Sequence, residues 1–110
     1  MGDQKADLLR GTLSMLILKT ITLKPMHGFG IMQRIEQITE GAFQVRPGSL
    51  FPSLHRLEQE GWIEGEWGES ENRRRAKFYR ITDEGRDQLT VEKENWSRAV
   101  GAVTRVLEAL

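Results

Sequence analysis

The first stretch of the chain, residues 7–23, has apolar positions that repeat with the period of a helix. They cover most of the helix circumference rather than one stripe: Leu8, Leu9, Leu13, Leu16, Ile17, Leu18, Ile21 and Leu23. This pattern is typical of a helix that is buried on several sides. Pro25 and Gly28 interrupt it, and a second helix with one apolar face is predicted over residues 29–38, ended by Gly41.

The next segment predicts a third amphipathic helix. Its apolar positions are three or four residues apart: Leu50, Leu54 and Leu57. Proline has no amide hydrogen, so Pro52 is tolerated only in the first turn, where no intrahelical donor is required. We therefore expect this helix to begin close to Ser49 and to end at Gly61.

The period of the apolar positions then changes from about 3.6 to 2. Residues 62–67 and residues 76–81 each alternate apolar or aromatic side chains with polar ones, and the polar stretch 68–75 joins them. Two such runs predict a β-hairpin with a long, charged tip.

The C-terminal segment predicts one long helix. Thr82 is expected to cap it, with Asp83 and Glu84 in the first turn, where the helix dipole favours acids. From there to Leu110 the helix would span about 28 residues and about 42 Å. Its apolar positions follow a heptad seam that is broken once by Lys93: Leu89, Trp96, Val100, Val103, Leu107 and Leu110. A helix longer than its own domain cannot bury such a seam alone, so we expect a partner helix, most simply from a second copy of the chain.

Composition adds limits on the kind of protein. A chain of 110 residues is expected to form one unit, and the lack of cysteine excludes disulfides and thiolate metal sites and fits a reducing cytoplasm. The longest apolar run, residues 15–18, is far shorter than the roughly 20 residues that span a bilayer, and no signal peptide opens the chain. We therefore expect a soluble cytoplasmic protein with no membrane partner.

The formal net charge is zero, yet the charges are segregated along the chain. Residues 1–57 carry seven basic and four acidic side chains, and residues 58–72 carry six acids and no base. Residues 73–82 carry five bases and no acid, and residues 83–110 carry four bases and six acids. Charges are screened beyond about 8 Å at physiological salt, so a chain that is neutral overall can still present a basic edge.

Candidates for catalysis are few. The chain contains no His-Glu-x-x-His pair, no Gly-x-Ser-x-Gly turn and no glycine-rich phosphate loop. We interpret His27 as a loop residue and His55 as an exposed helix residue. The glutamates between Glu58 and Glu66 form a solvated run without an apolar pocket to raise a pKa. The sequence therefore predicts no enzyme activity, no metal site and no cofactor.

The predicted order of three helices, a hairpin and a last helix is that of a winged helix-turn-helix protein, mainly α with a small β-hairpin (α+β). We expect residues 1–81 to form the winged domain and residues 82–110 to form a dimerisation helix. In this plan the third helix enters the major groove of double-stranded DNA, and the hairpin lies along the adjacent backbone.

Polar and basic residues lie at both of these predicted contact elements. The candidate residues that face the groove are Ser49, Pro52, Ser53, His55 and Arg56. The candidate contacts of the wing are Arg73, Arg74, Arg75 and Lys77. Basic side chains there would neutralise phosphates, which supplies most of the sequence-independent affinity for DNA. A plain solvated turn is the alternative interpretation of the three arginines.

Four ordered motifs resemble the PadR family of bacterial transcriptional regulators. Residues 47–63 resemble its recognition-helix signature, G-x-L-Y-P-x-L-x-R-L-E-x-x-G-x-I, and residues 9–13, 27–29 and 79–86 match further family positions. The chain departs from the family pattern at two tyrosines, which are replaced by Phe29 and Phe51. A tyrosine hydroxyl at position 51 could donate a hydrogen bond to a phosphate, and a phenylalanine cannot.

The resemblance implies a homodimeric repressor whose C-terminal helices pair and whose recognition helices address the half-sites of a pseudo-palindromic operator, about 34–36 Å apart. Phe51 joins the candidate groove residues through its place in the family motif. Some members bind aromatic small molecules between the paired helices, so Trp96 is a candidate contact for a small aromatic effector, although interface packing is the simpler interpretation. The alternative function is a winged-helix module that binds protein, for which the acidic run beside the basic wing is suited.

Overall fold

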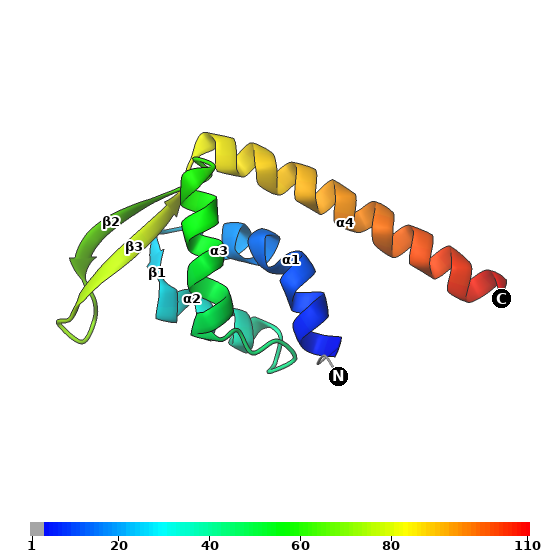
Figure 1. Cartoon of the computed structure of the whole chain (residues 1–110), viewed down its shortest axis with the longest axis horizontal. Coiled ribbons are helices and arrows are strands. Elements are labelled where there is room, and N and C mark those ends of the chain that lie inside the picture. The colour runs from blue at the N-terminus through cyan, green and yellow to red at the C-terminus, as the bar shows by residue number, and fades with distance from the viewer. Residues whose placement is uncertain (1–3) are drawn as a thin grey trace.

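The computed structural model describes the backbone of residues 4–110 and the side chains of residues 12–110. In this part of the chain four helices and three strands follow one another (Figure 1). They are α1 (Gln4–Thr20), β1 (Met26–His27), α2 (Gly28–Ile38), α3 (Pro47–Gln59), β2 (Ile63–Glu69), β3 (Arg75–Ile81) and α4 (Asp83–Ala109). The architecture is the expected winged helix-turn-helix with a long last helix, which extends away from the rest of the chain (Figure 1).

Two helix ends differ from the sequence predictions. α1 ends at Thr20 rather than near Leu23, which is 96% exposed. The helix ends in a tighter turn, because the amide and the hydroxyl of Thr22 both donate to the carbonyl of Lys19, at 3.2 and 2.8 Å. α3 begins at Pro47 rather than near Ser49, because a proline in the first helical position has the right backbone angle and needs no amide partner.

The early start of α3 places Pro52 in the second turn of the helix. A helix normally bonds each amide to the carbonyl four residues earlier, so Pro52 leaves the carbonyl of Gly48 without a helical donor. Gly48 is exposed and its surroundings are open, so water can satisfy that carbonyl.

The three strands form one antiparallel sheet in the order β1-β3-β2. The predicted hairpin is confirmed, with Ile63 opposite Ile81 and Glu69 opposite Arg75. Its strands are longer than expected, so the connecting tip is only residues 70–74. β1 pairs with β3 at two positions and was not predicted, because two residues are too few to show an alternating pattern.

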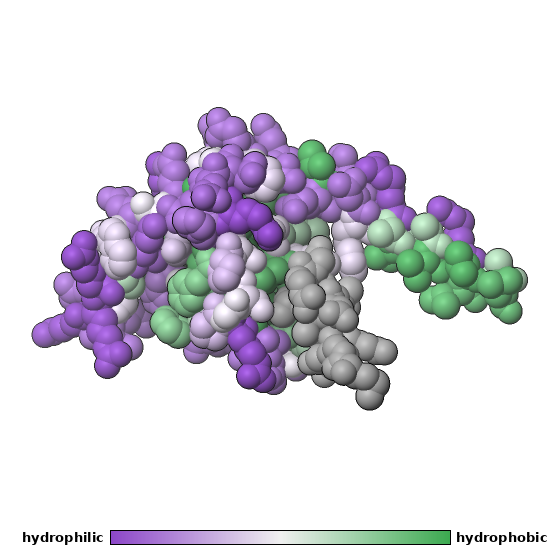
Figure 2. All heavy atoms as spheres, viewed as in Figure 1, coloured by the Kyte–Doolittle hydropathy of each residue, from purple (hydrophilic) through white to green (hydrophobic). Residues whose placement is uncertain are grey.

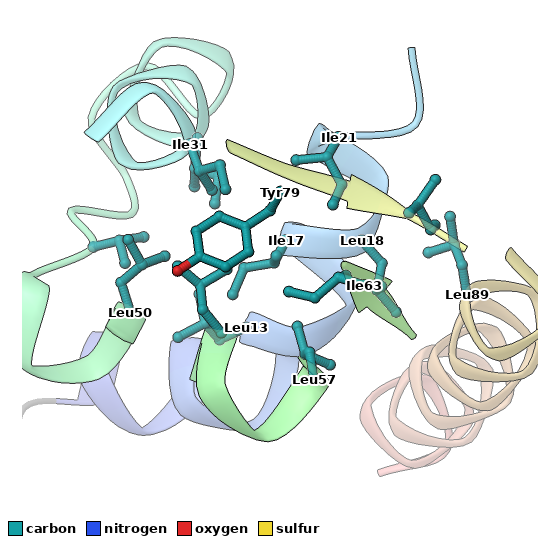
Figure 3. Close-up of a cluster of buried hydrophobic side chains, with 14 residues drawn as sticks. Leu13, Ile17, Leu18, Ile21, Ile31, Leu50, Leu57, Ile63, Tyr79 and Leu89 are labelled. Atoms are coloured by element: carbon teal, nitrogen blue, oxygen red, sulfur yellow. The ribbon is translucent and has the colours of Figure 1, made fainter. Parts of the chain in front are cut away.

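The core lies where α1 packs against α2, α3 and α4, which confirms that α1 is buried on several sides (Figure 3). Every helix and the sheet contribute to this cluster of buried side chains: Leu13, Ile17, Leu18, Ile21, Ile31, Ile35, Val45, Leu50, Leu54, Leu57, Ile63, Tyr79, Ile81 and Leu89. α3 and the hairpin are therefore anchored to one core.

α4 starts at Asp83, as predicted, because Thr82 caps it. The Thr82 hydroxyl accepts a hydrogen bond from the amide of Gly85 at 3.0 Å and donates one to the carbonyl of Gly61 at 2.7 Å. The guanidinium of Arg86 donates to the carbonyl of Thr22 at 3.0 Å. These contacts attach the first turns of α4 to the ends of α1 and α3.

Candidate nucleic-acid interface

The predicted groove residues of α3 do not all lie on its surface. Ser49, Pro52, His55 and Arg56 are exposed. Ser53 is only 8% exposed, so its assignment to the groove-facing surface was wrong. Ser53 follows Leu50 by three residues and precedes Leu57 by four, which places it on the buried face of the helix.

The structure also adds one candidate that the sequence analysis missed. Gln59 is exposed and lies one turn after His55, which places it on the same ridge of α3 as Pro52. Its side-chain amide has the donor and acceptor pair that recognises adenine. The helical period alone could have identified this position.

α2 positions the first turns of α3 through a glycine. A Cβ atom at Gly28 would lie 2.9 Å from Cε1 and 3.0 Å from Cζ of Phe51. The absence of a side chain therefore lets the Phe51 ring rest against the start of α2.

His27 has a structural role next to this contact. It is the N-cap of α2, because its Nδ1 accepts a hydrogen bond from the amide of Gly30 at 3.0 Å. Its ring also packs edge-on against Phe78, with 5.3 Å between the ring centroids.

The hairpin tip and the first residue of β3 present three exposed arginines, which we call the tip arginines: Arg73, Arg74 and Arg75. The turn is held by the Ser70 amide, which donates to the Arg74 carbonyl at 2.8 Å, and by the Arg73 amide, which donates to the Ser70 carbonyl at 2.9 Å. The Arg75 guanidinium stacks on the ring of Trp67, 4.8 Å from its centroid. The tip arginines thus lie on a defined turn and on the strand residue that follows it.

Lys77 is held differently from the three arginines. Its Nζ lies 2.9 Å from Oε1 of Glu58 at the end of α3, and its side chain crosses over Gly65, where a Cβ would be 2.2 Å from Lys77 Cε. The hydrogen bond to the Glu58 carboxylate raises the pKa of Lys77. Lys77 therefore ties β3 to α3, and its placement among the free wing contacts is corrected.

Arg80 forms a second ion pair of the same kind, with Glu64 across the hairpin. Two of the five bases in residues 73–82 are thus matched by acids from residues 58–72. The hairpin thus brings the acidic segment 58–72 next to the basic segment 73–82. What is left at the tip is the group of three arginines.

Most of the predicted helix seam of α4 is exposed. The exposed fractions rise toward the C-terminus: Trp96 42%, Val100 44%, Val103 58%, Leu107 74% and Leu110 101%. Val106, 56% exposed, lies three residues after Val103 and widens the same stripe. Figure 2 shows hydrophobic surface gathered on the free end of α4. Contiguous exposed apolar surface of this kind marks an interaction site.

Leu89 does not belong to this exposed seam. It is 7% exposed and packs in the core of its own chain, so its assignment to the dimer interface was wrong. The first turns of α4 lie against the body of the domain, and the same stripe becomes free only beyond them.

Glu92 lies in this stripe between the buried and the exposed parts. Its Oε2 is buried and has no hydrogen-bond partner among the residues that the structure describes. Burial raises the pKa of the Glu92 carboxyl, and the positive charge of Arg56 on α3 lowers it by less. Folding therefore shifts the ionisation of this carboxyl to higher pH.

We expect Glu92→Gln to stabilise the fold slightly at pH 7, because glutamine keeps the shape of the side chain and removes the partly buried negative charge. The pKa of the Glu92 carboxyl is higher in the folded state than its ordinary value of 4.5, so the folded state binds this proton more tightly than the unfolded state. Ionisation of the carboxyl at higher pH therefore lowers the free energy of unfolding. The gain over the wild type should therefore shrink as pH falls to about 4. Urea unfolding at fixed protein concentration across this range measures it.

The matched control is Glu94→Gln, because Glu94 is exposed and half a helical turn away from Glu92. It should change the unfolding midpoint little at any pH. An equal gain in the two variants would show that the effect is one of net charge.

Neither a metal centre nor a membrane span emerges from residues 4–110. No cluster of three or more metal-ligating His, Cys, Asp or Glu side chains occurs among the described residues. Among those residues, no helix combines the length and the hydropathy needed to cross a bilayer.

Comparison with known proteins agrees with this geometry. Residues 17–91 match the model of the transcriptional regulator PadR-like family. The transcriptional regulator Rv3488 of Mycobacterium tuberculosis is 32% identical over 84 residues, which cover 76% of this chain and 75% of the relative.

Two solved structures extend the similarity to the long helix. A transcriptional regulator from Clostridium thermocellum superposes with a TM-score of 0.83 and 26% identity, covering 90% of this chain and 96% of its own. A PadR-like transcriptional regulator from Bacillus cereus gives a TM-score of 0.77 and 31% identity, with 92% and 96% coverage. These relatives are transcriptional regulators rather than enzymes. The chain thus belongs to the PadR-like family of transcriptional regulators.

Proposed function

We propose that this chain is a homodimeric repressor that binds a pseudo-palindromic DNA operator, with α3 in the major groove and the hairpin tip on the neighbouring backbone. The observation that carries the proposal is that both elements with which a winged helix contacts DNA carry exposed basic side chains. Arg56 lies on the surface of α3, and Arg73, Arg74 and Arg75 lie at the tip. These are the two places at which a winged helix meets a duplex.

The dimer part of the proposal rests on the exposed seam of α4. Five of its apolar side chains are more than 40% exposed on a helix that extends beyond the body of the chain (Figures 1 and 2). Pairing with the same helix of a second copy would bury them and would place two recognition helices on one duplex. We assign Trp96 to this packing; stacking of an aromatic effector on it stays a prediction, which a fluorescence titration would test.

The alternative function, a module that binds only protein, loses part of its support. It relied on the acidic run as a free surface beside the basic wing. Glu58 and Glu64 of that run are already engaged by Lys77 and Arg80 of the same chain.

The proposal is tested by selecting bound duplexes from a random DNA pool and titrating the selected sequence against mixed DNA at several salt concentrations. We expect an inverted repeat and an affinity that falls steeply with salt, as phosphate neutralisation requires. Transcription in vitro from a template that carries the selected site should fall as protein is added. Binding without sequence preference would contradict an operator.

We expect Arg74→Ala to weaken binding to specific and mixed DNA alike, because a phosphate contact carries no sequence information. The salt slope should fall by about 0.9 for each phosphate that the variant no longer neutralises. By contrast, His55→Ala or Arg56→Ala should change the preference at one base position by about 1–3 kcal/mol. Titrations of both DNA samples at several salt concentrations separate the two effects.

Lys77→Ala serves as the matched control for the wing. Since Lys77 is paired with Glu58, its removal should leave the salt slope nearly unchanged. If all four variants bound both DNA samples with equally reduced affinity, the division between groove and backbone contacts would be wrong.

A further inference from the structure

An exposed pair of aromatic rings lies where α2 and α3 begin. Phe29 is 66% exposed and Phe51 is 40% exposed. The rings meet edge to face, with centroids 6.2 Å apart and an interplanar angle of 71°. Phe51 also rests on Gly28, where any side chain would collide with its ring. An apolar ring is therefore held in a fixed place at the leading end of α3 while much of its surface stays in water.

The segment of the chain that contains Phe51 is basic. Residues 41–57 contain two arginines and no acid. Phe51 immediately precedes Pro52 and lies one turn before His55, so it adjoins the exposed ridge of α3. The aromatic pair is thus an apolar patch beside a segment whose positive charge favours contact with DNA.

Base chemistry narrows what such a point can recognise. A phenylalanine ring offers no hydrogen-bond donor or acceptor, so it cannot read the polar edges of the bases. The apolar group that the major groove displays is the 5-methyl group of thymine, and phenylalanine is among the side chains that contact it.

We propose that Phe51 contacts the 5-methyl group of a thymine in each half-site and selects a T·A pair there over C·G. Phe29 is a positioning residue, which holds the Phe51 ring through their edge-to-face contact. This inference rests on the proposed DNA-binding function and deepens it, because it names a base at one position of the operator.

The test replaces thymines of the selected duplex by deoxyuridine, which lacks only the methyl group, one symmetric pair of positions at a time. At one pair the wild type should lose about fourfold in affinity for each methyl group removed. Phe51→Ala should bind more weakly but be indifferent to deoxyuridine at that pair. Phe29→Ala should reduce the deoxyuridine effect without abolishing it.

Trp67→Ala is the matched control, because Trp67 is also an exposed aromatic residue, 58% exposed, but lies in the wing. It should retain the full deoxyuridine effect. If thermal unfolding shows that Phe51→Ala does not fold, Phe51→Leu replaces it; leucine keeps an apolar contact with Gly28 but is shorter than the ring, and its deoxyuridine effect should be smaller than that of the wild type.

Three results would overturn the inference while leaving sequence-specific, salt-dependent binding intact. They are a selected site with no thymine at a constant distance from its centre, no deoxyuridine effect at any position, and an effect that persists fully in both Phe51 variants. Failure to select any sequence would instead overturn the proposed function itself.

Discussion

Gly85→Ala should destabilise the fold by about 3 kcal/mol and lower the Tm by more than about 10 °C. A Cβ atom at Gly85 would lie 2.0 Å from the carbonyl oxygen of Trp62 and 2.8 Å from Cγ1 of Ile81. That carbonyl cannot move away freely, because it accepts a hydrogen bond from the Thr82 amide at 3.1 Å. The first turn of α4 would have to shift, with loss of the Thr82 cap. Thermal and urea unfolding measure the change.

Gly101→Ala is the control for this prediction, because it makes the same substitution in the same helix. A Cβ there would meet only Arg105 Nη1, at 3.8 Å. Alanine is favoured over glycine in a helix by about 1 kcal/mol, so this variant should be slightly more stable than the wild type. If both variants unfolded at the wild-type midpoint, the contact between α4 and the Trp62 carbonyl would not limit the fold.

Val103→Asp should convert the protein to a monomer of 12.6 kDa and lower its affinity for the selected operator by about 100-fold or more. Val103 is at the middle of the exposed seam, so pairing would bury an aspartate carboxylate without a partner, which costs several kcal/mol. A monomer also loses the gain from binding two linked half-sites. Sedimentation gives the mass, and titration gives the affinity.

The folded state of the monomer should persist, because Val103 lies outside the core cluster. Ser97→Asp introduces the same charge one residue after Trp96, on an exposed position outside the heptad seam, and should leave the dimer intact. A Val103→Asp protein that still sediments as a dimer would place the interface on another surface.

The order of the elements could be predicted from the sequence because each one has a local signal. The change of apolar period from 3.6 to 2 marks the hairpin, and Thr82 followed by two acids marks the start of α4. These signals depend on residues within one or two turns of each other. β1 was not predicted, because two residues are too few to show an alternating pattern of side chains. It is a strand because it pairs with β3, which is distant in the sequence.

The sites could be predicted only in part. The arginines at the tip and the outer face of α3 follow from local pattern, whereas Lys77 and Glu58 are 19 residues apart and meet because the hairpin folds back on α3. Leu89 has the same heptad spacing as Trp96, yet the body of the domain covers it. The spacing of the apolar residues indicates which face of α4 is apolar, but it does not indicate which surface packs against that face.

The sequence by itself determined the order of the elements, the apolar stripe of α4 and the family motifs, because helix caps, side-chain periods and motifs are properties of neighbouring residues. The tertiary structure alone decided which charges stay free, which part of the stripe is exposed and that Phe29 meets Phe51. Burial and ion pairing depend on which distant segments are brought together. Of the five bases in residues 73–82, Lys77 and Arg80 are thus paired with acids of the same chain, whereas the three arginines stay exposed.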